Sequence, residues 1–434
     1  MELRLKNIGM IKEANVKIDG LTVIAGENDT GKSTIGKVIF CIIKATSRYK
    51  EDFNESKTFK IEEKLNRLFF YVRRNINIID EVPEEYYEKL KNILSMDYYI
   101  ENNHNPKEYL ESLYNHLFPL KVVIYDDNTV NHTEKILNEL EFIINTPEDK
   151  NKSIENALTK VFRSEFDSNI LSFGEDIGFI KLVENTLTLL ELKIENNRIE
   201  IMGDCEPIEF NEITFIETPL ILNNHDMLIR SQTGLDTTKR SSRRLGIPYT
   251  TLHTKDLFDK LKSNEFIFID DFEMNLKLDI SEIIQGEIVY DVDERDFVYI
   301  KDSNKIPIKN TATGIKAFGI IQLLIDAGFI SKSSVLVLDE PEIHIHPKWQ
   351  LKYAQLISVL VDNGVPIIVT SHSPYMIEAL QRYSDRRNLQ NKTNFYLANN
   401  KIIEDKNKLQ EIYEKLSEPF DEFEKMDSDI LNGK

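Results

Sequence analysis

Eight consecutive residues, Gly26 to Ser33, combine the types that bind phosphate, because they read Gly-Glu-Asn-Asp-Thr-Gly-Lys-Ser. Glycines let the backbone curl so that its N–H groups face a phosphate, and the N-terminus of a following helix adds a partial positive charge. The Lys32 ammonium would reach the β- and γ-phosphates of a nucleotide, and the Ser33 hydroxyl would hold Mg²⁺. The expected binding residues are Gly26, Glu27, Asn28, Asp29, Thr30, Gly31, Lys32, Ser33 and Thr34.

Two acidic residues, Asp339 and Glu340, directly follow the apolar run from Val335 to Leu338. A continuous apolar run is typical of a strand that is covered on both faces. At the carboxyl end of that strand, Asp339 would reach Mg²⁺ beside Ser33, and Glu340 would polarise the water that attacks the γ-phosphate. The alternative is that both acids cap the next helix. Their combination with the phosphate loop favours the catalytic interpretation.

A histidine, His372, follows the next apolar strand, in the stretch Thr-Ser-His-Ser-Pro at residues 370–374. One strand–helix unit after Asp339 and Glu340, it could contact the γ-phosphate as a sensor. A lone histidine is otherwise a structural residue with satisfied hydrogen bonds. The position in the order of motifs favours the sensor, so we predict Glu340, Lys32 and His372 as the catalytic residues.

These side chains need strands that end at one edge of a sheet. The run 21–25 predicts a strand that leads into the loop, and a helix is predicted from Lys32 to about Lys44. From Thr313 onward, helical and strand patterns alternate, which is typical of a parallel α/β core. The predicted helices are 315–327, 348–361 and 374–382, and the predicted strands are 335–339 and 366–370.

Between the two halves of this core, residues 46–165 are helical in pattern and never sustain heptads, so a compact insertion is expected instead of a coiled-coil arm. Strand patterns return at 187–194, 198–202 and 213–217, and a hairpin is predicted at 287–301. We expect residues 1–45 to form the first part of the ATPase core, 46–185 a mainly helical insertion, and 186–434 the remainder of the core with a helical tail.

Composition limits the class of protein. The net charge of −19 over 434 residues argues against coating of nucleic acid through bulk charge. The two cysteines, Cys41 and Cys205, form no C-x-x-C pair, so neither a disulfide nor a zinc site is expected. No signal peptide and no run of about 18 apolar residues occurs, which predicts a cytoplasmic protein without a membrane span.

The order of motifs resembles ABC-type ATPases of the overcoming-lysogenisation-defect group, with relatives in the Septu and PARIS anti-phage systems, which are cousins of the SMC and Rad50 heads. The matching motifs are the phosphate loop, the Thr-Gly element at 313–314, the stretch Leu-Asp-Glu-Pro-Glu-Ile-His-Ile-His-Pro at 338–347, and residues 370–374. The resemblance covers residues 1–45 and about 205–385. It implies an α/β ABC/SMC-head-like fold with ATP and Mg²⁺ as cofactors, and a slow, regulatory ATPase activity.

The resemblance also implies a homodimer, or a higher oligomer of dimers, that traps ATP between the phosphate loop of one subunit and a signature element of the other. Here that element is Ala312, Thr313 and Gly314. The alternative is an ordinary helix cap by Thr311 or Thr313. Glu217 is the candidate equivalent of the family's glutamine loop, with a metal or water role, because no glutamine occurs between residues 35 and 231. It could equally be a solvated strand end.

Two further sets of residues allow alternatives. Glu342, His344 and His346 could mimic a metal cluster, but His346-Pro347 matches a loop of the family instead. The basic residues Lys239, Arg240, Arg243 and Arg244 could contact nucleic acid or an acidic partner, or form a solvated loop.

Relatives of the overcoming-lysogenisation-defect type carry a C-terminal toprim nuclease. The stretch after His372 is shorter than the roughly 100 residues that a domain needs, so the effector nuclease or toxin is expected to be a separate chain. The resemblance thus predicts a nucleotide-switched sensor and scaffold of an anti-phage system. The alternative is an SMC/RecF-like DNA-maintenance ATPase that clamps nucleic acid directly.

Overall fold

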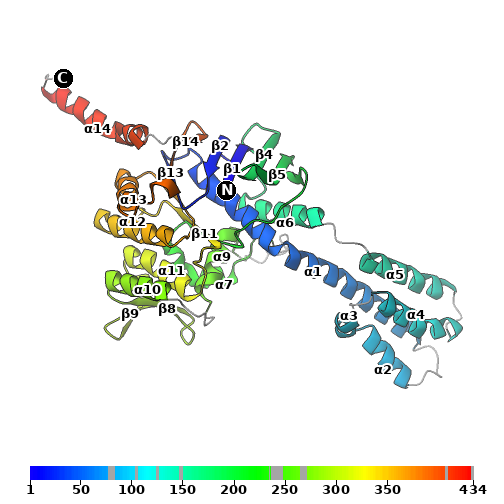
Figure 1. Ribbon diagram of the computed structural model, residues 1–434. Coiled ribbons are helices and arrows are strands. Elements are labelled where there is room, and N and C mark those ends of the chain that lie inside the picture. The colour runs from blue at the N-terminus through cyan, green and yellow to red at the C-terminus, as the bar shows by residue number, and fades with distance from the viewer. Residues whose placement is uncertain are drawn as a thin grey trace. The chain divides into compact units, whose positions relative to one another are not determined.

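The computed structural model describes residues 1–76, 84–102, 106–123, 127–145, 150–233, 235, 248–263, 271–405 and 409–431 (Figure 1). Contacts between residues divide the chain into two compact units. The first unit consists of Met1–Ser47 and Ile154–Lys434, and the second of Arg48–Ser153. From the sequence, we predicted the boundaries of the insertion after residues 45 and 185.

An eleven-stranded mixed sheet forms the centre of the first unit, in the order β6-β5-β4-β1-β2-β14-β13-β3-β12-β11-β7. Strands β13, β3, β12, β11 and β7 are mutually parallel, whereas β6, β5, β4, β1 and β2 pair antiparallel. The α/β fold class predicted from the sequence is therefore confirmed. The strands are β1 (Glu2–Ile8), β2 (Ile11–Lys17), β3 (Leu21–Gly26), β4 (Ile177–Glu184), β5 (Leu187–Glu195), β6 (Arg198–Ile201), β7 (Glu212–Ile216), β11 (Ser334–Asp339), β12 (Ile367–Ser371), β13 (Thr393–Asn399) and β14 (Ile402–Asp405).

Every residue of β3, β11 and β12 is buried, as their continuous apolar sequences predict. One hydrophobic cluster joins these strands to the helices that cover them. The helices are α9 (Leu252–Leu261), α10 (Asp271–Ile284), α11 (Thr313–Asp326), α12 (Pro347–Asp362) and α13 (Pro374–Arg386). Helix α14 (Leu409–Leu431) adds Ile412 to the same cluster.

A small antiparallel sheet, β10-β9-β8, packs beside α11. Its strands are β8 (Glu287–Asp291), β9 (Asp296–Lys301) and β10 (Asn304–Pro307), so the hairpin predicted at 287–301 is confirmed. The short elements η1 (Pro219–Asn224), α7 (His225–Arg230), η2 (Ile308–Asn310) and η3 (Gln390–Lys392) connect the larger ones.

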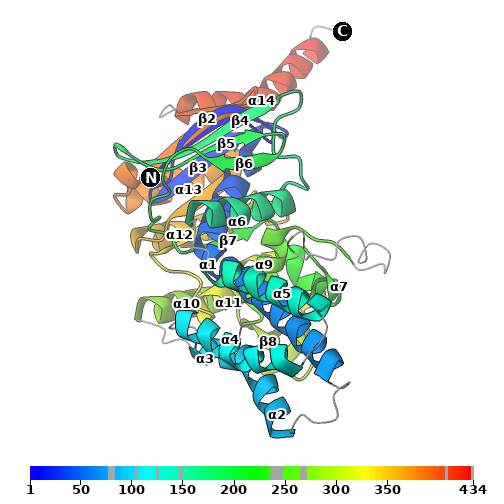
Figure 2. The same ribbon diagram turned by 90° about the vertical axis from the view of Figure 1, so that its right-hand side faces the viewer.

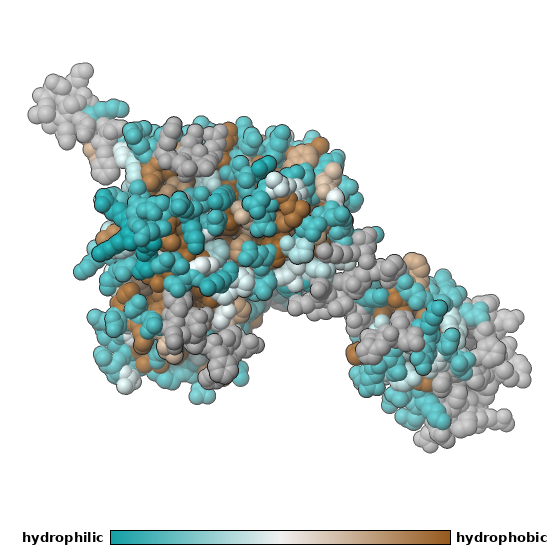
Figure 3. Space-filling view, viewed as in Figure 1, coloured by the Kyte–Doolittle hydropathy of each residue, from teal (hydrophilic) through white to brown (hydrophobic). Residues whose placement is uncertain are grey.

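Helix α6 (Lys150–Glu165) precedes β4 and lies along the antiparallel strands, as Figure 2 shows. Glu155 of this helix accepts a hydrogen bond from the Ile201 N–H in β6. Polar residues dominate the face of this unit that Figure 3 shows, with apolar residues between them. Among the described residues, no helix combines the length and the apolar composition that a membrane crossing requires.

The first helix is much longer than predicted, because α1 runs from Lys32 to Ile76 and not to about Lys44. The change from apolar to polar residues near Lys44 suggested an end. It is not a stop signal, since residues 37–76 contain neither proline nor glycine. Apolar residues instead mark the part of α1 that is buried in the first unit.

Apart from the turn at residues 94 and 95, the described residues of the second unit are helical, as expected for the insertion. Besides α1 it contains α2 (Glu84–Ile93), α3 (Met96–Asn102), α4 (Pro106–Val123) and α5 (Asp127–Asn145). Its own apolar core includes Leu65, Leu113 and Leu140. Lys64 on α1 pairs with Glu139 on α5 at 2.7 Å.

Candidate functional site

Three neighbouring parallel strands bring the predicted motifs to one edge of the sheet. Strand β12 lies between β3 and β11, with Val369 paired to both Val23 and Leu338. Because parallel strands end at the same edge, the phosphate loop after β3, the acids at the end of β11 and His372 after β12 converge there.

The phosphate loop is a narrow cradle built on close backbone approaches. A Cβ on Gly26 would lie 2.6 Å from the Ala398 carbonyl oxygen, so only glycine fits. Gly31 has a φ of +91°, which also favours glycine. The Lys32 ammonium donates to the Glu27 carbonyl at 2.7 Å, and α1 begins at Lys32. The loop thus ends at a helix N-terminus, as anion binding requires.

The two predicted magnesium ligands meet across the loop. The Ser33 hydroxyl hydrogen-bonds to the Asp339 carboxylate, and the Thr370 hydroxyl donates to Asp339 Oδ1 at 2.5 Å. Burial raises the pKa of Asp339, and the charges of Glu217 and Glu340 act in the same direction, against these hydrogen bonds. A hydroxyl and a carboxylate are hard oxygen donors of the kind that Mg²⁺ prefers, so the residues fit this ion.

Glu340 lies between the other two predicted catalytic residues. Its Oε1 is 3.5 Å from Lys32 Nζ and 3.5 Å from His372 Nδ1. Its backbone has a φ of +48°, and its N–H donates to both the carbonyl and the hydroxyl of Thr370, each at 3.1 Å. A non-glycine residue with this backbone conformation is strained and is kept only where the surrounding structure holds it, as is common at functional sites.

Glu342 anchors the segment that carries His372. Its Oε1 accepts from the Ser371 hydroxyl at 2.7 Å, from the His372 N–H at 2.9 Å and from the Ser373 N–H at 3.2 Å. Burial raises the pKa of Glu342. His346, in contrast, accepts from the Lys348 N–H at the start of α12. No group of three or more potential metal-binding side chains is found in the part of the chain that the structure describes.

Glu217 lies beside Asp339, because Ile216 of β7 pairs with Leu338 of β11 and both acids are the next residues along their strands. Its carboxylate is half-exposed and is 3.2 Å from His253 Nε2. The hydrogen bond with His253 lowers the pKa of Glu217.

His253 was not predicted from the sequence, and it lies at the start of α9. Burial lowers its pKa, but hydrogen bonds to Glu165 and Glu217 outweigh burial and raise it to about 9. No local signal in the sequence reveals these hydrogen bonds, because His253, Glu165 and Glu217 are far apart in the chain.

The predicted signature residues are at the N-terminus of α11. Ala312 is the N-cap residue and makes no side-chain cap. The Thr311 hydroxyl donates instead to the Pro307 carbonyl. Gly314 packs closely on Trp349, since a Cβ there would lie 2.8 Å from the indole. Helix α11 contacts η1, α9, α10 and β8. The predicted basic residues Lys239, Arg240, Arg243 and Arg244 lie outside the described residues.

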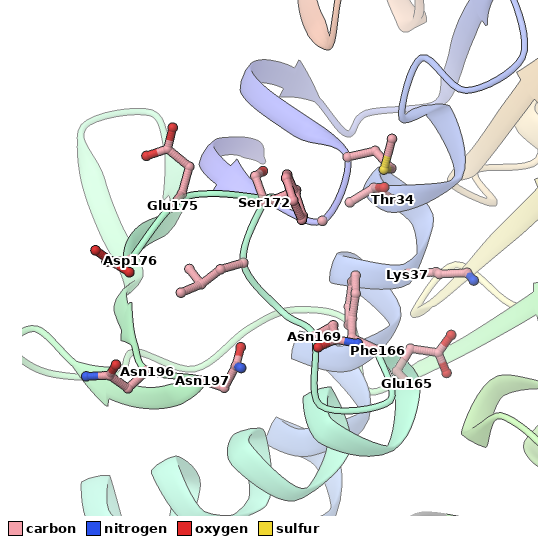
Figure 4. A pocket seen from close by; sticks show the side chains of 14 residues that line it. Thr34, Lys37, Glu165, Phe166, Asn169, Ser172, Glu175, Asp176, Asn196 and Asn197 are labelled. Atoms are coloured by element: carbon pink, nitrogen blue, oxygen red, sulfur yellow. The ribbon is translucent and has the colours of Figure 1, made fainter.

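A pocket of about 800 Å³ adjoins the phosphate loop at Thr34 (Figure 4). Lys37, Phe166 and Glu165 line one side of it, and Asp176 lies on the opposite side. The sequence did not predict this pocket, because it forms between the β1–β2 turn, helix α1 and the segment that follows α6.

Comparison with known proteins places the chain among ATPases. A family model described as "AAA ATPase domain" matches residues 1–377. The glucosylceramide transporter ABCA12 of Homo sapiens is 34% identical over 91 residues, which are 21% of this chain. The Septu protein PtuA of Bacillus thuringiensis is 40% identical over 45 residues, which are 10% of this chain. The chain spans only 4% and 11% of the length of these two relatives.

Among solved structures, the SMC head domain from Thermotoga maritima is 12% identical, with a TM-score of 0.34. That match covers 93% of this chain and 96% of the other. The family model covers most of the chain and includes the phosphate loop, the acidic strand and His372. The chain therefore belongs to the AAA ATPase domain family.

Proposed function

We propose that the chain binds ATP with Mg²⁺ and hydrolyses it slowly, as a nucleotide-dependent switch. The observation that carries this proposal is the convergence of Lys32, Glu340 and His372, with Oε1 of Glu340 3.5 Å from each of the other two. Hydrolysis of this kind depends mainly on positioning and on charge neutralisation.

In this mechanism Lys32 and the loop N–H groups hold the phosphates. When bound, Mg²⁺ neutralises phosphate charge, and Ser33 and Asp339 would hold it. Glu340 orients and polarises the attacking water, and His372 detects the γ-phosphate. The pocket at Thr34 would take the nucleoside, because it adjoins the loop and offers Phe166 for stacking and Asn169 for hydrogen bonds.

The test is phosphate release by the wild type and by two variants. Glu340→Gln should keep ATP binding and lose more than about 90% of turnover, which is at least ~1.4 kcal/mol of transition-state stabilisation. Lys32→Ala should lose ATP binding itself. Turnover of Glu340→Gln near the wild-type rate, or unchanged ATP affinity of Lys32→Ala, would contradict the assignment.

We further propose that two copies close on two ATP molecules, each completed by Ala312, Thr313 and Gly314 of the partner subunit. The absence of a side-chain cap at Ala312 supports this, because N–H groups at the start of α11 remain available to a phosphate. The local similarity to Septu PtuA supports an anti-phage role in which the switch controls a separate effector chain.

Light scattering of the Glu340→Gln variant with ATP and Mg²⁺ tests the assembly. We expect a dimer or a multiple of it, and a monomer at all nucleotide concentrations would contradict closure. Addition of the product of a neighbouring gene tests the effector. Capture of that product supports the sensor and scaffold, whereas ATP-dependent, salt-sensitive binding of DNA alone would favour the DNA-maintenance function.

A further inference from the structure

Three side chains from distant parts of the sequence meet beside the proposed hydrolytic site. Glu165 ends α6, Glu217 follows β7, and His253 lies in the first turn of α9. The His253 ring lies between the other two, with its two nitrogens directed at one carboxylate each. Carboxylates accept hydrogen bonds, so each nitrogen donates.

Glu165 anchors the histidine. Its Oε1 is 2.6 Å from His253 Nδ1, and its Oε2 accepts from the His253 N–H at 3.3 Å. Both side chains are buried, with exposed fractions of 0% for Glu165 and 1% for His253. Phe215 and Phe40 flank the ring, with centroids 4.6 Å and 6.1 Å from it. The hydrogen bonds of the His253 backbone and side chain to Glu165, together with this packing, restrict the His253 ring to one orientation.

The other end of the histidine reaches a carboxylate that is open to solvent. His253 Nε2 is 3.2 Å from Glu217 Oε2, and the Glu217 side chain is 50% exposed. The Thr251 hydroxyl, at 3.4 Å, is a second and longer contact of this nitrogen. The buried Glu165–His253 pair thus holds one exposed carboxylate, that of Glu217.

That carboxylate lies where the reaction is proposed to occur. Asp339 ends β11 and Glu217 directly follows the adjacent parallel strand β7, and the two are close enough for the Glu217 charge to act on Asp339. We propose that His253, held by Glu165, is a positioning residue that fixes Glu217 at the nucleotide site. This inference rests on the proposed function and adds to it the residue that makes Glu217 part of the site.

A neighbouring cluster shows what a purely structural arrangement looks like. One turn further along α9, Asp256 pairs with Lys44 at 2.5 Å and with Lys260 at 2.8 Å. Lys260 also bonds to the Ile213 carbonyl, at the start of β7, away from the strand end that carries Glu217. Asp256 therefore provides a matched control on the same helix.

The experiment is a double-mutant cycle on ATP turnover with His253→Asn and Glu217→Ala. The asparagine amide can replace Nδ1 as donor to Glu165 but is too short to reach Glu217. We expect His253→Asn to lower kcat about ten- to a hundredfold with little change in KM, as loss of a supporting contact does. In the Glu217→Ala background the same substitution should have no further effect on kcat.

The control Asp256→Asn should lower the melting temperature and leave kcat within about twofold. Additive losses in the cycle, or an equal loss of kcat in Asp256→Asn, would overturn the inference, because the histidine would then act through stability alone. A wild type without turnover would overturn the proposed hydrolysis instead. In that case the same double-mutant cycle is measured on the Kd for ATPγS with Mg²⁺. Non-additive effects of the two substitutions on this Kd support the positioning role, and additive effects overturn it.

Discussion

The Thr370 hydroxyl joins the two acids that the site depends on. It donates to Asp339 Oδ1 at 2.5 Å and accepts from the Glu340 N–H at 3.1 Å. One buried hydroxyl therefore contacts both the carboxylate that would hold Mg²⁺ and the backbone of Glu340, the residue proposed to polarise the water.

We expect Thr370→Val to lower kcat about tenfold, or ~1.4 kcal/mol, because valine has nearly the same shape but cannot make either bond. Stability should fall by about 1–3 kcal/mol, because the buried Asp339 carboxylate loses a hydrogen-bond donor. Steady-state phosphate release and urea unfolding measure the two effects. Thr370→Ser keeps the hydroxyl and should retain most of the activity. A kcat of Thr370→Val within twofold of the wild type would show that the hydroxyl does not position the acids.

At the scale of elements, the start of α1 must lie very close to the sheet. A Cβ on Gly36 would lie 2.6 Å from Val337 Cγ1 and 2.8 Å from Phe215 Cε2. These atoms belong to stiff, buried side chains of β11 and β7. The glycine lets the helix that follows the phosphate loop pack directly on the strands that carry the acids.

Gly36→Ala should therefore destabilise the protein, although alanine is normally better in a helix by about 1 kcal/mol. Overpacking costs about 1–3 kcal/mol, so we expect a net loss of up to about 2 kcal/mol in urea unfolding. Val337→Ala removes one of the two clashing groups, so the double variant should lose less than the sum of the single variants. Stabilisation by Gly36→Ala alone would contradict the close approach.

At the scale of the whole molecule, every described residue of the proposed site belongs to the first unit. Both units have a hydrophobic cluster of their own. Folding of the first unit and its binding of nucleotide should therefore not require the second.

We expect a variant in which a short Gly/Ser linker replaces Arg48–Ser153 to fold cooperatively and to bind ATPγS with Mg²⁺ within about threefold of the wild-type affinity. Thermal unfolding and equilibrium titration measure this. The matched control is the same variant with Lys32→Ala, which should fold but not bind. Aggregation of the shortened chain would show that the second unit contributes to the stability of the first.

The sequence by itself determined the phosphate loop, the acidic strand and His372, because each depends on a few consecutive residues whose local structure is set by glycine, by apolar runs and by helix starts. The parallel α/β core follows from the alternation of helical and strand patterns after Thr313. Only the tertiary structure showed that α1 continues to Ile76. Residues 37–76 contain no stop signal, and the change from apolar to polar residues near Lys44 reflects where the helix is buried and not where it ends. Only the tertiary structure also shows the contacts of Glu165, His253 and Glu342. Their contacts join segments that are tens of residues apart, and such contacts leave no periodicity in a single sequence.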